Sequence, residues 1–237
     1  MHSETVSRLA RGLTLLTVAN PKIMKGIDVG YATAGLHLSP ANESGYNTCA
    51  NHSAECAHNC IYFSGYGNLP TTRKARINRT IQYFDARHHF LTVLRKDLTR
   101  FLANAQAEKL TPVVRLNLTS DIRWENHDIP QSFPTITFYD YTKLENRKDL
   151  PSNYTLVFSF SGTNLDACRT ALANGMSVAV PFRKRPATWL GYPTIDGDLD
   201  DLRFLHTDPV IIGLSPKGRL NSDPKSLFLG DNHPAAA

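Results

Sequence analysis

Five short apolar runs recur in the C-terminal half of the chain, and they constrain the fold more than any other feature. The runs cover residues 112–118, 135–141, 154–160, 176–182 and 208–214. Each is rich in Val, Ile, Phe and Tyr and has the length of a buried strand. Between the third and fourth runs, residues 164–175 are predicted to form a crossover helix that ends at Gly175, because glycine is a common C-cap. Apolar strands joined by such a helix predict a mostly parallel sheet covered on both faces.

The N-terminal half supplies the elements that precede these strands. Residues 26–40 contain spaced glycines and alternating apolar positions, which predict a strand or a hairpin. Residues 41–70 have no apolar period and are predicted to be a loop. Residues 71–108 have helical periodicity and predict two helices or one long bent helix. The predicted fold class is therefore α/β, a partial or complete (β/α) barrel with a cysteine-bearing loop after the first strand.

A chain of 237 residues suits one large domain or two small ones. We expect an N-terminal arm over residues 1–25, a single barrel-like domain over 26–225 and a flexible C-terminal tail over 226–237. No apolar stretch approaches the roughly 20 residues that cross a bilayer. The expectation is a protein of the cytoplasm, not of a membrane.

Polar and ionisable side chains follow each predicted strand. Functional groups gather at the carboxyl ends of parallel strands, both in barrels and in open sheets. The expected catalytic residues are Asp121, Asp140, Lys143 and Arg183, and the expected cofactor-binding residues are Asn117, Ser120, Asp121, Ser159, Ser161 and Lys217. Asp196 and Asp198 are expected to line the same rim. The competing interpretation is that these residues only end strands and cap helices.

Three cysteines, Cys49, Cys56 and Cys60, stand within twelve residues on the predicted loop. Reduced thiols gathered on a polar loop predict a metal site. Structural zinc needs a fourth ligand, for which His52 and His58 are candidates. An iron–sulfur cluster held by three cysteines instead leaves one iron open to an exchangeable ligand. The spacing leaves both open, and Cys168, in the predicted crossover helix, is expected to pack in the core.

The formal net charge is +5, with basic clusters at residues 73–79 and 183–185. These clusters are compatible with a nucleic-acid partner, although solvated surfaces are the commoner reason for such clusters. The chain has no P-loop and no Gly-x-Ser-x-Gly, which lowers the prospects of a cluster-free hydrolase or transferase.

The order of a strand, a cysteine loop, a helix and then β/α units resembles the radical S-adenosylmethionine (SAM) superfamily. That resemblance implies a partial β/α barrel and a [4Fe–4S] cluster on Cys49, Cys56 and Cys60. The open iron would bind SAM, whose reductive cleavage gives a carbon radical. Because no Gly-Gly-Glu follows the next strand, Asn117, Ser120 and Asp121 would take the place of that motif.

More closely, the chain resembles a family of bacteriophage proteins that look like small, divergent radical-SAM relatives. The shared motifs include TAGLHLSP at 33–40, the three-cysteine loop at 49–60, RLN-x-TSD at 115–121, FYDYTK at 138–143, the strand ending FS-x-S at 158–161, PFRK at 181–184, the segment at 188–198 and GL-x-x-KGR at 213–219. The resemblance covers nearly the whole chain beyond residue 26 and implies the cytoplasm of an infected bacterial host as its location.

These observations predict a phage iron–sulfur protein, resembling radical-SAM enzymes, that acts on a nucleotide or nucleic acid. The alternative is a zinc-stabilised protein without catalysis that binds nucleic acid or a host protein through its basic clusters.

Overall fold

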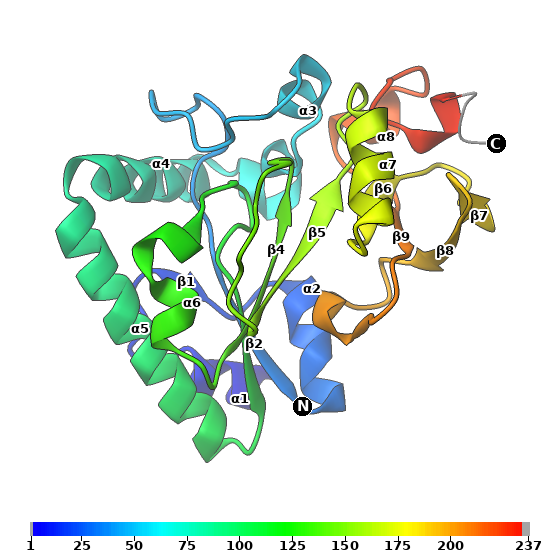
Figure 1. The fold of residues 1–237 in the computed structure, drawn as a ribbon. Coiled ribbons are helices and arrows are strands. Elements are labelled where there is room, and N and C mark those ends of the chain that lie inside the picture. The colour runs from blue at the N-terminus through cyan, green and yellow to red at the C-terminus, as the bar shows by residue number, and fades with distance from the viewer. Residues whose placement is uncertain (1, 234–237) are drawn as a thin grey trace.

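The computed structural model describes residues 2–233 (Figure 1), in which nine strands form one sheet with the order β1-β2-β3-β4-β5-β6-β9-β8-β7. The strands are β1 Leu16–Thr17, β2 Tyr31–Leu36, β3 Thr111–Arg115, β4 Thr137–Thr142, β5 Tyr154–Ser159, β6 Val178–Pro181, β7 Thr188–Trp189, β8 Tyr192–Asp196 and β9 Ile211–Leu214. All five apolar runs of the C-terminal half contain a strand.

Strands β2 to β6 lie side by side in chain order and pair in parallel, and β9 continues the series beside β6. Strand β8 is parallel to β9, whereas β1 and β7 pair antiparallel at the two ends of the sheet. This sequential winding is that of β/α barrels, in which each crossover leads to the neighbouring strand. It confirms the α/β class and the mostly parallel sheet, while closure into a barrel stays a prediction.

The described residues form eight α-helices around the sheet (Figure 1). They are α1 His2–Leu9, α2 Pro21–Met24, α3 Ala54–His58, α4 Pro70–Asp85, α5 Arg87–Ala107, α6 Ile129–Ser132, α7 Leu165–Ala173 and α8 Arg219–Ser222. The longest, α5, packs along one face of the sheet, and the opposite face is called the inner face. The predicted helical region 71–108 is two helices, because Ala86 leaves the helical conformation with φ −129° and ψ 47°. The crossover helix α7 is followed by Gly175 with φ +82°, a left-handed conformation that suits glycine.

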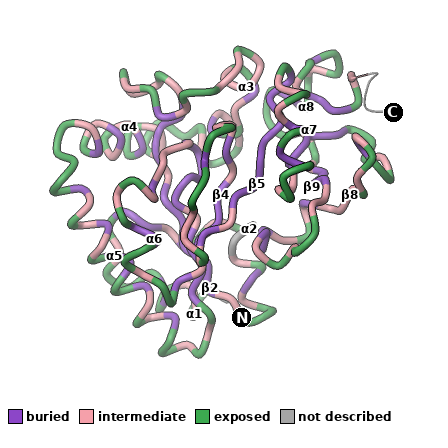
Figure 2. Tube along the Cα trace, viewed as in Figure 1, coloured by how far each residue is buried: buried purple, intermediate pink, exposed green. Residues whose placement is uncertain are grey.

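The main core lies between α5 and the first strands of the sheet. Phe90, Leu94, Leu98 and Phe101 of α5 are buried in one cluster with the apolar side chains of β2 and β3. A second cluster packs α7 on β5, β6 and β9 and contains Cys168, as expected. Figure 2 shows the buried residues concentrated along the strands and the inward faces of the helices.

Both chain ends are more integrated than predicted. Residues 2–25 carry α1, β1 and α2, and Leu9, Leu15, Leu16 and Val18 are buried in the main core. The buried carboxylate of Asp97 accepts the N–H groups of residues 14–16, which explains why this segment is held as more than an arm. Residues 226–233 also pack on the domain, since Leu229 is fully buried. The rest of the predicted tail, residues 234–237, lies outside the described residues.

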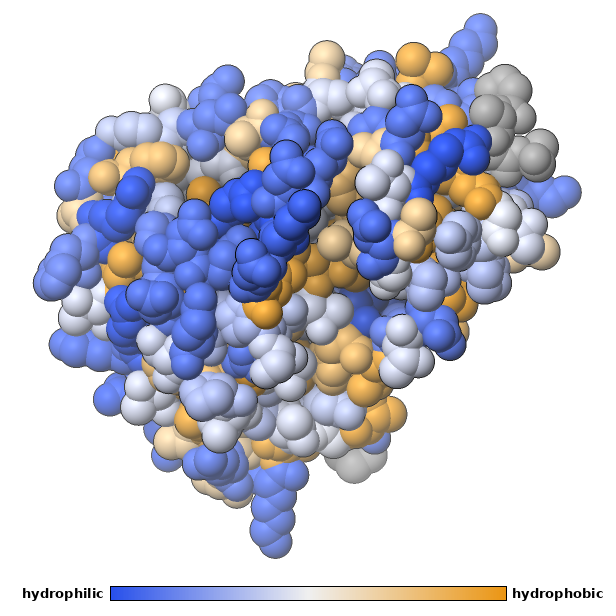
Figure 3. Space-filling model, viewed as in Figure 1, coloured by the Kyte–Doolittle hydropathy of each residue, from blue (hydrophilic) through white to orange (hydrophobic). Residues whose placement is uncertain are grey.

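None of the helices described over residues 2–233 has the length and apolar character that a bilayer span requires. The face drawn in Figure 3 is largely hydrophilic, and its hydrophobic side chains appear in separate small patches.

Candidate functional site

A cavity of about 1310 Å³ opens at the carboxyl ends of the parallel strands. The strand ends of β3, β4, β5 and β9 supply one wall through Asn117, Lys143, Ser159 and Ser215, and the cysteine loop and α4 supply the other. The carboxyl edge of a parallel sheet is the usual place for an active site. A smaller cavity of about 730 Å³ lies along α5, away from this edge, and its described lining residues include no thiol, carboxylate or imidazole.

All three loop cysteines line the large cavity. Cys56 is positioned by α3, whose N-cap Ser53 accepts the Cys56 N–H at 3.0 Å and donates its own hydroxyl to the carbonyl of Ser161 after β5. The loop is also tied to the ends of two strands, because Thr48 donates its hydroxyl to the carbonyl of Ser39 and accepts the N–H of Asp121. The sheet therefore anchors the loop beside Cys49 and Cys56.

The cysteines are free thiols, and burial raises the pKa of Cys60 to about 11 and that of Cys49 above its usual value. Over residues 2–233, no three His, Cys, Asp or Glu side chains are arranged so that they could hold a metal ion. His52 lies in the same cavity with its Nδ1 2.6 Å from the carbonyl oxygen of Cys49. A carbonyl only accepts, so Nδ1 is the hydrogen-bond donor in this contact.

Lys143, directly after β4, lies in the cavity opposite the cysteines. Burial lowers the pKa of its ammonium, but Cys56, Asp121, Cys49 and Cys60 face it and together raise that pKa above the usual value. The backbone at this point is held by Asp121, whose Oδ2 accepts the Lys143 N–H at 2.7 Å. Burial raises the pKa of the Asp121 carboxyl. The structure thus brings a cation, a carboxyl and three thiols into one cavity.

Of the other predicted site residues, Asn117, Ser120, Ser159 and Lys217 also line the cavity. Lys217 pairs with Asp198 at 3.2 Å, which holds both on the rim. The Asn117 side chain is occupied by local structure, since its Oδ1 accepts the Ile122 N–H and the Trp124 indole N–H.

Asp140 does not line the cavity, contrary to prediction. Its carboxyl is buried on the other side of the sheet, where it accepts hydrogen bonds from the Asn117 N–H at 2.7 Å and the Tyr154 hydroxyl at 2.7 Å. Successive side chains of a strand alternate between faces, and Tyr139 and Tyr141 occupy the inner face. Asp140 therefore contacts the helix-covered core and serves structure there.

Arg183, Ser161 and Asp196 are likewise absent from the described cavity lining. The Arg183 guanidinium donates to the carbonyls of Leu220 and Asn221 and so holds α8. Ser161 supplies backbone groups to the turn before α7, and Asp196 pairs with Arg185 at 3.0 Å on the surface. These three predicted site residues end strands and hold loops.

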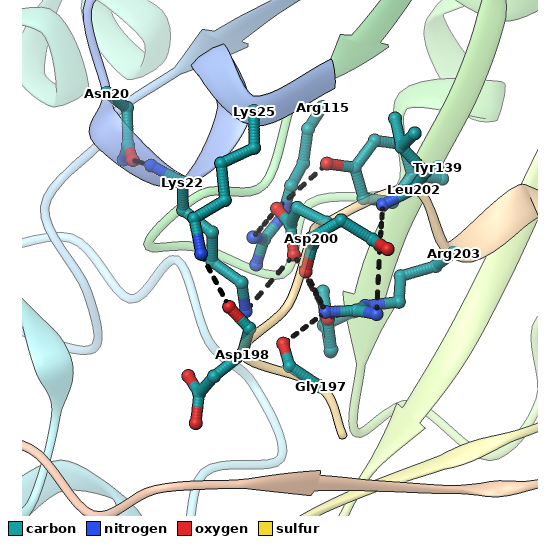
Figure 4. A network of polar contacts seen from close by, with 12 residues as sticks. Asn20, Lys22, Lys25, Arg115, Tyr139, Gly197, Asp198, Asp200, Leu202 and Arg203 are labelled. Atoms are coloured by element: carbon teal, nitrogen blue, oxygen red, sulfur yellow. Dashed lines mark hydrogen bonds and ion pairs between the residues drawn. The ribbon is translucent and has the colours of Figure 1, made fainter. Parts of the chain in front are cut away.

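A polar network on the inner face of the sheet was not predicted. Asp201, from the loop after β8, accepts from the Tyr139 hydroxyl at 2.8 Å and pairs with Arg115 at 3.0 Å and Lys22 at 3.4 Å. Figure 4 shows Lys22, Arg115 and the neighbouring Arg203 converging on this loop from α2, β3 and the loop itself. The aspartate run at 196–201 signalled a polar loop, but nothing in the sequence indicated its distant partners.

Basic side chains of α4 also reach the cavity. Arg76 and Arg79 belong to the cluster at 73–79, and His37 follows β2; all three line the cavity. Of the described lining residues, six are cationic (Lys22, Arg76, Arg79, Arg115, Lys143 and Lys217) and four anionic (Glu43, Asp121, Asp198 and Asp201). The cavity is therefore positively charged.

The comparisons with known proteins give one match. The family model described as Gene product 88 matches residues 8–228, which is nearly the whole chain. No curated protein and no solved structure matches. The match agrees with the expected bacteriophage origin and carries no activity with it. The chain belongs to the Gene product 88 family of phage proteins.

Proposed function

We propose that this protein is a phage enzyme whose active site is the large cavity, with a [4Fe–4S] cluster held there by Cys49, Cys56 and Cys60. One observation carries the proposal: three thiols from a tethered loop line a single cavity at the carboxyl edge of a sequentially wound parallel sheet. We propose a nucleotide or nucleic acid as its substrate and the reducing cytoplasm of the bacterial host as its place of action.

The three cysteine thiols are chemically suited to bind an iron–sulfur cluster. Three thiols are the ligands that iron–sulfur clusters require, and Lys143 supplies a positive charge opposite them. Because the described side chains are not drawn together into a metal-holding group, binding requires the cysteine loop to tighten. That loop contains short α-helical and 3₁₀ segments. Its hydrogen bonds to the sheet are made by Thr48 and Ser53, which precede the span between Cys56 and Cys60.

A cluster held by three cysteines supplies one-electron reduction and an open iron site for a ligand such as SAM. Residues of the chain itself would balance charge, hold the site in place and attract the substrate. Lys143 would offset negative charge beside the thiols, Asp121 would hold the backbone of Lys143 in place, and the arginines of α4 would attract an anionic substrate.

A zinc site is the second candidate, and His52 favours it. The imidazole lines the cavity beside the cysteine loop with Nδ1 on the Cys49 carbonyl, so Nε2 would complete a Cys₃His set. In that case the protein would be a zinc-stabilised binding protein.

The test is metal analysis after purification without oxygen. We expect about four irons and four sulfides per chain, together with a visible absorption band that changes when SAM is added. Cys56→Ala should lose the iron, whereas Cys168→Ala, which removes a buried thiol of α7, should retain it. Stoichiometric zinc without iron would overturn the cluster and favour the binding protein.

A further inference from the structure

We propose that Arg76, Arg79 and His37 form a subsite for the phosphate monoester of the substrate, in the part of the cavity between α4 and the end of β2. The inference concerns the substrate of the proposed enzyme and rests on the cavity being its active site, but not on the cysteines holding a cluster.

Among the described residues, the two arginines are held outside any ion pair, although the charge of Asp97 acts on Arg79 while that carboxylate accepts the N–H groups of residues 14–16. Neither Arg76 nor Arg79 is ion-paired within the described part of the chain, whereas Arg73 on the same helix pairs with Glu43 and Arg115 with Asp201. Burial, before the other charges, lowers the pKa of both guanidinium groups. A partly buried arginine without an ion-pair partner has lost hydration that an anion could replace. Such arginines are expected in a binding site for an anion.

The geometry holds these side chains in place before any ligand binds. Arg76 lies with its guanidinium 5.3 Å from the centre of the Tyr62 ring. Arg79 comes three residues later on α4 and therefore projects from the same side of the helix. A Cβ at Gly67 would come within 2.8 Å of the Tyr62 carbonyl oxygen and 3.1 Å of Arg76 Nη1, so glycine lets the backbone pass close to this guanidinium.

His37 supplies the third group. Its Nδ1 is buried and has no hydrogen-bond partner among the described residues, and its ring lines the same cavity. Burial and the charges of Arg76, Arg115 and Arg79 lower the pKa of His37 to about 3, so the ring is neutral and donates one hydrogen bond. The segment is pinned to α4, because Thr80 Oγ1 accepts the Ser39 N–H at 2.8 Å.

The chemistry of the subsite favours a phosphate monoester. Near neutral pH a monoester carries a charge close to −2 and three acceptor oxygens. Two guanidinium groups outside any described ion pair match that charge, and their forked donors with one imidazole N–H match the oxygens. A phosphodiester carries one charge and a carboxylate has two oxygens, so each would leave donors unmatched. The subsite borders the cysteines, since Cys60 interacts electrostatically with Arg76.

The experiment is calorimetric titration of the full-length protein, at constant salt, with inorganic phosphate, 5′-AMP, adenosine, glutarate and an oligonucleotide lacking a terminal phosphate. We expect phosphate and AMP to bind and adenosine to bind far more weakly. Arg79→Gln should weaken AMP binding by at least about tenfold. The matched control is Lys74→Gln, which removes one exposed charge from the same helix and should change affinity less than about twofold.

Arg79→Lys keeps the charge but loses the fork and should recover part of the affinity, with melting curves showing that each variant is folded. The proposal is overturned if adenosine or glutarate binds as tightly as AMP, or if the unphosphorylated oligonucleotide binds more tightly than AMP. It is also overturned if Arg79→Gln lowers the affinity for AMP no more than Lys74→Gln does. Cys56→Ala should keep AMP affinity. Iron retention without AMP binding would refute the subsite alone, and AMP binding without iron would refute the cluster alone.

Discussion

Asp140 illustrates what burial does to a single ionisable residue in this sheet. Its carboxyl is fully enclosed, and burial raises its pKa from 3.8 to about 7, although the hydrogen bond from Tyr154 and the charge of Arg115 oppose the rise. Between these two values the folded chain holds a proton that the unfolded chain releases. Linkage then requires the free energy of unfolding to fall as pH rises through that window, by at most about 1.4 kcal/mol per pH unit from this group.

We therefore expect Asp140→Asn to flatten the pH dependence of stability between pH 4 and pH 7. An asparagine keeps an oxygen to accept the Asn117 N–H but has no proton to take up. Urea denaturation at several pH values, with reductant present, measures the difference between variant and wild type. Parallel stability curves would mean that Asp140 is ionised throughout this range.

At the scale of elements, one hydroxyl joins the end of β2 to α4. Thr80 Oγ1 accepts the Ser39 N–H at 2.8 Å and donates to the Arg76 carbonyl at 2.9 Å, and Thr80 is completely buried. Residues 39 and 80 are separated by the whole cysteine loop. This contact therefore fixes the helix relative to the sheet on one side of the cavity.

Thr80→Val should destabilise the protein by about 1–3 kcal/mol, because valine fills the same space and leaves the buried Ser39 N–H without an acceptor. The control is Thr92→Val on α5, where an exposed hydroxyl donates only to its own helix. That change should cost less than about 0.5 kcal/mol. Equal effects on the urea midpoint would show that the Thr80 contact contributes nothing beyond helix propensity.

At the scale of the whole molecule, the Asp201 network connects the two ends of the sheet. The carboxylate comes from the loop after β8 and reaches Arg115 on β3 and Lys22 on α2, so it joins segments far apart in the sequence (Figure 4). Although burial raises the pKa of Asp201, the charges of Arg115, Lys22 and Arg203 hold it below the usual value. The stability this group contributes is present above the pKa of an unfolded aspartate and is lost as pH falls through the lowered folded value.

Asp201→Asn should cost about 3–5 kcal/mol at neutral pH, because it leaves buried cations without their counter-charge. Asp200→Asn is the matched control. Its side chain is 44 % exposed and pairs with Arg203 at 3.5 Å, so its loss should cost about 1 kcal/mol or less. The free energy of unfolding from urea denaturation compares the two, and a cost for Asp201→Asn no larger than that for Asp200→Asn would contradict the role of the network.

Much of the fold could be predicted from the sequence. The five apolar runs, the helices of 71–108 and the crossover helix before Gly175 were all confirmed, because burial imposes a periodicity that residues reveal locally. Strand β8 was missed because Tyr192–Asp196 is only partly buried and carries polar residues. Within the candidate site, the cysteines, Asp121, Lys143 and Lys217 line the large cavity, and their roles there stay predictions.

The sequence by itself determined the strands of the five apolar runs, the mostly parallel sheet and the rim at which polar groups gather. Only the tertiary structure decided which of those groups face the cavity. A residue at a strand end points to either side according to its parity, so Asp140 lies in the core while Lys143, just beyond the strand, faces the thiols. Contacts between distant segments are equally invisible in the sequence. The charge of Arg79 acts on His37, and Asp201 pairs with Lys22, because packing brings those segments together and not because of any local pattern.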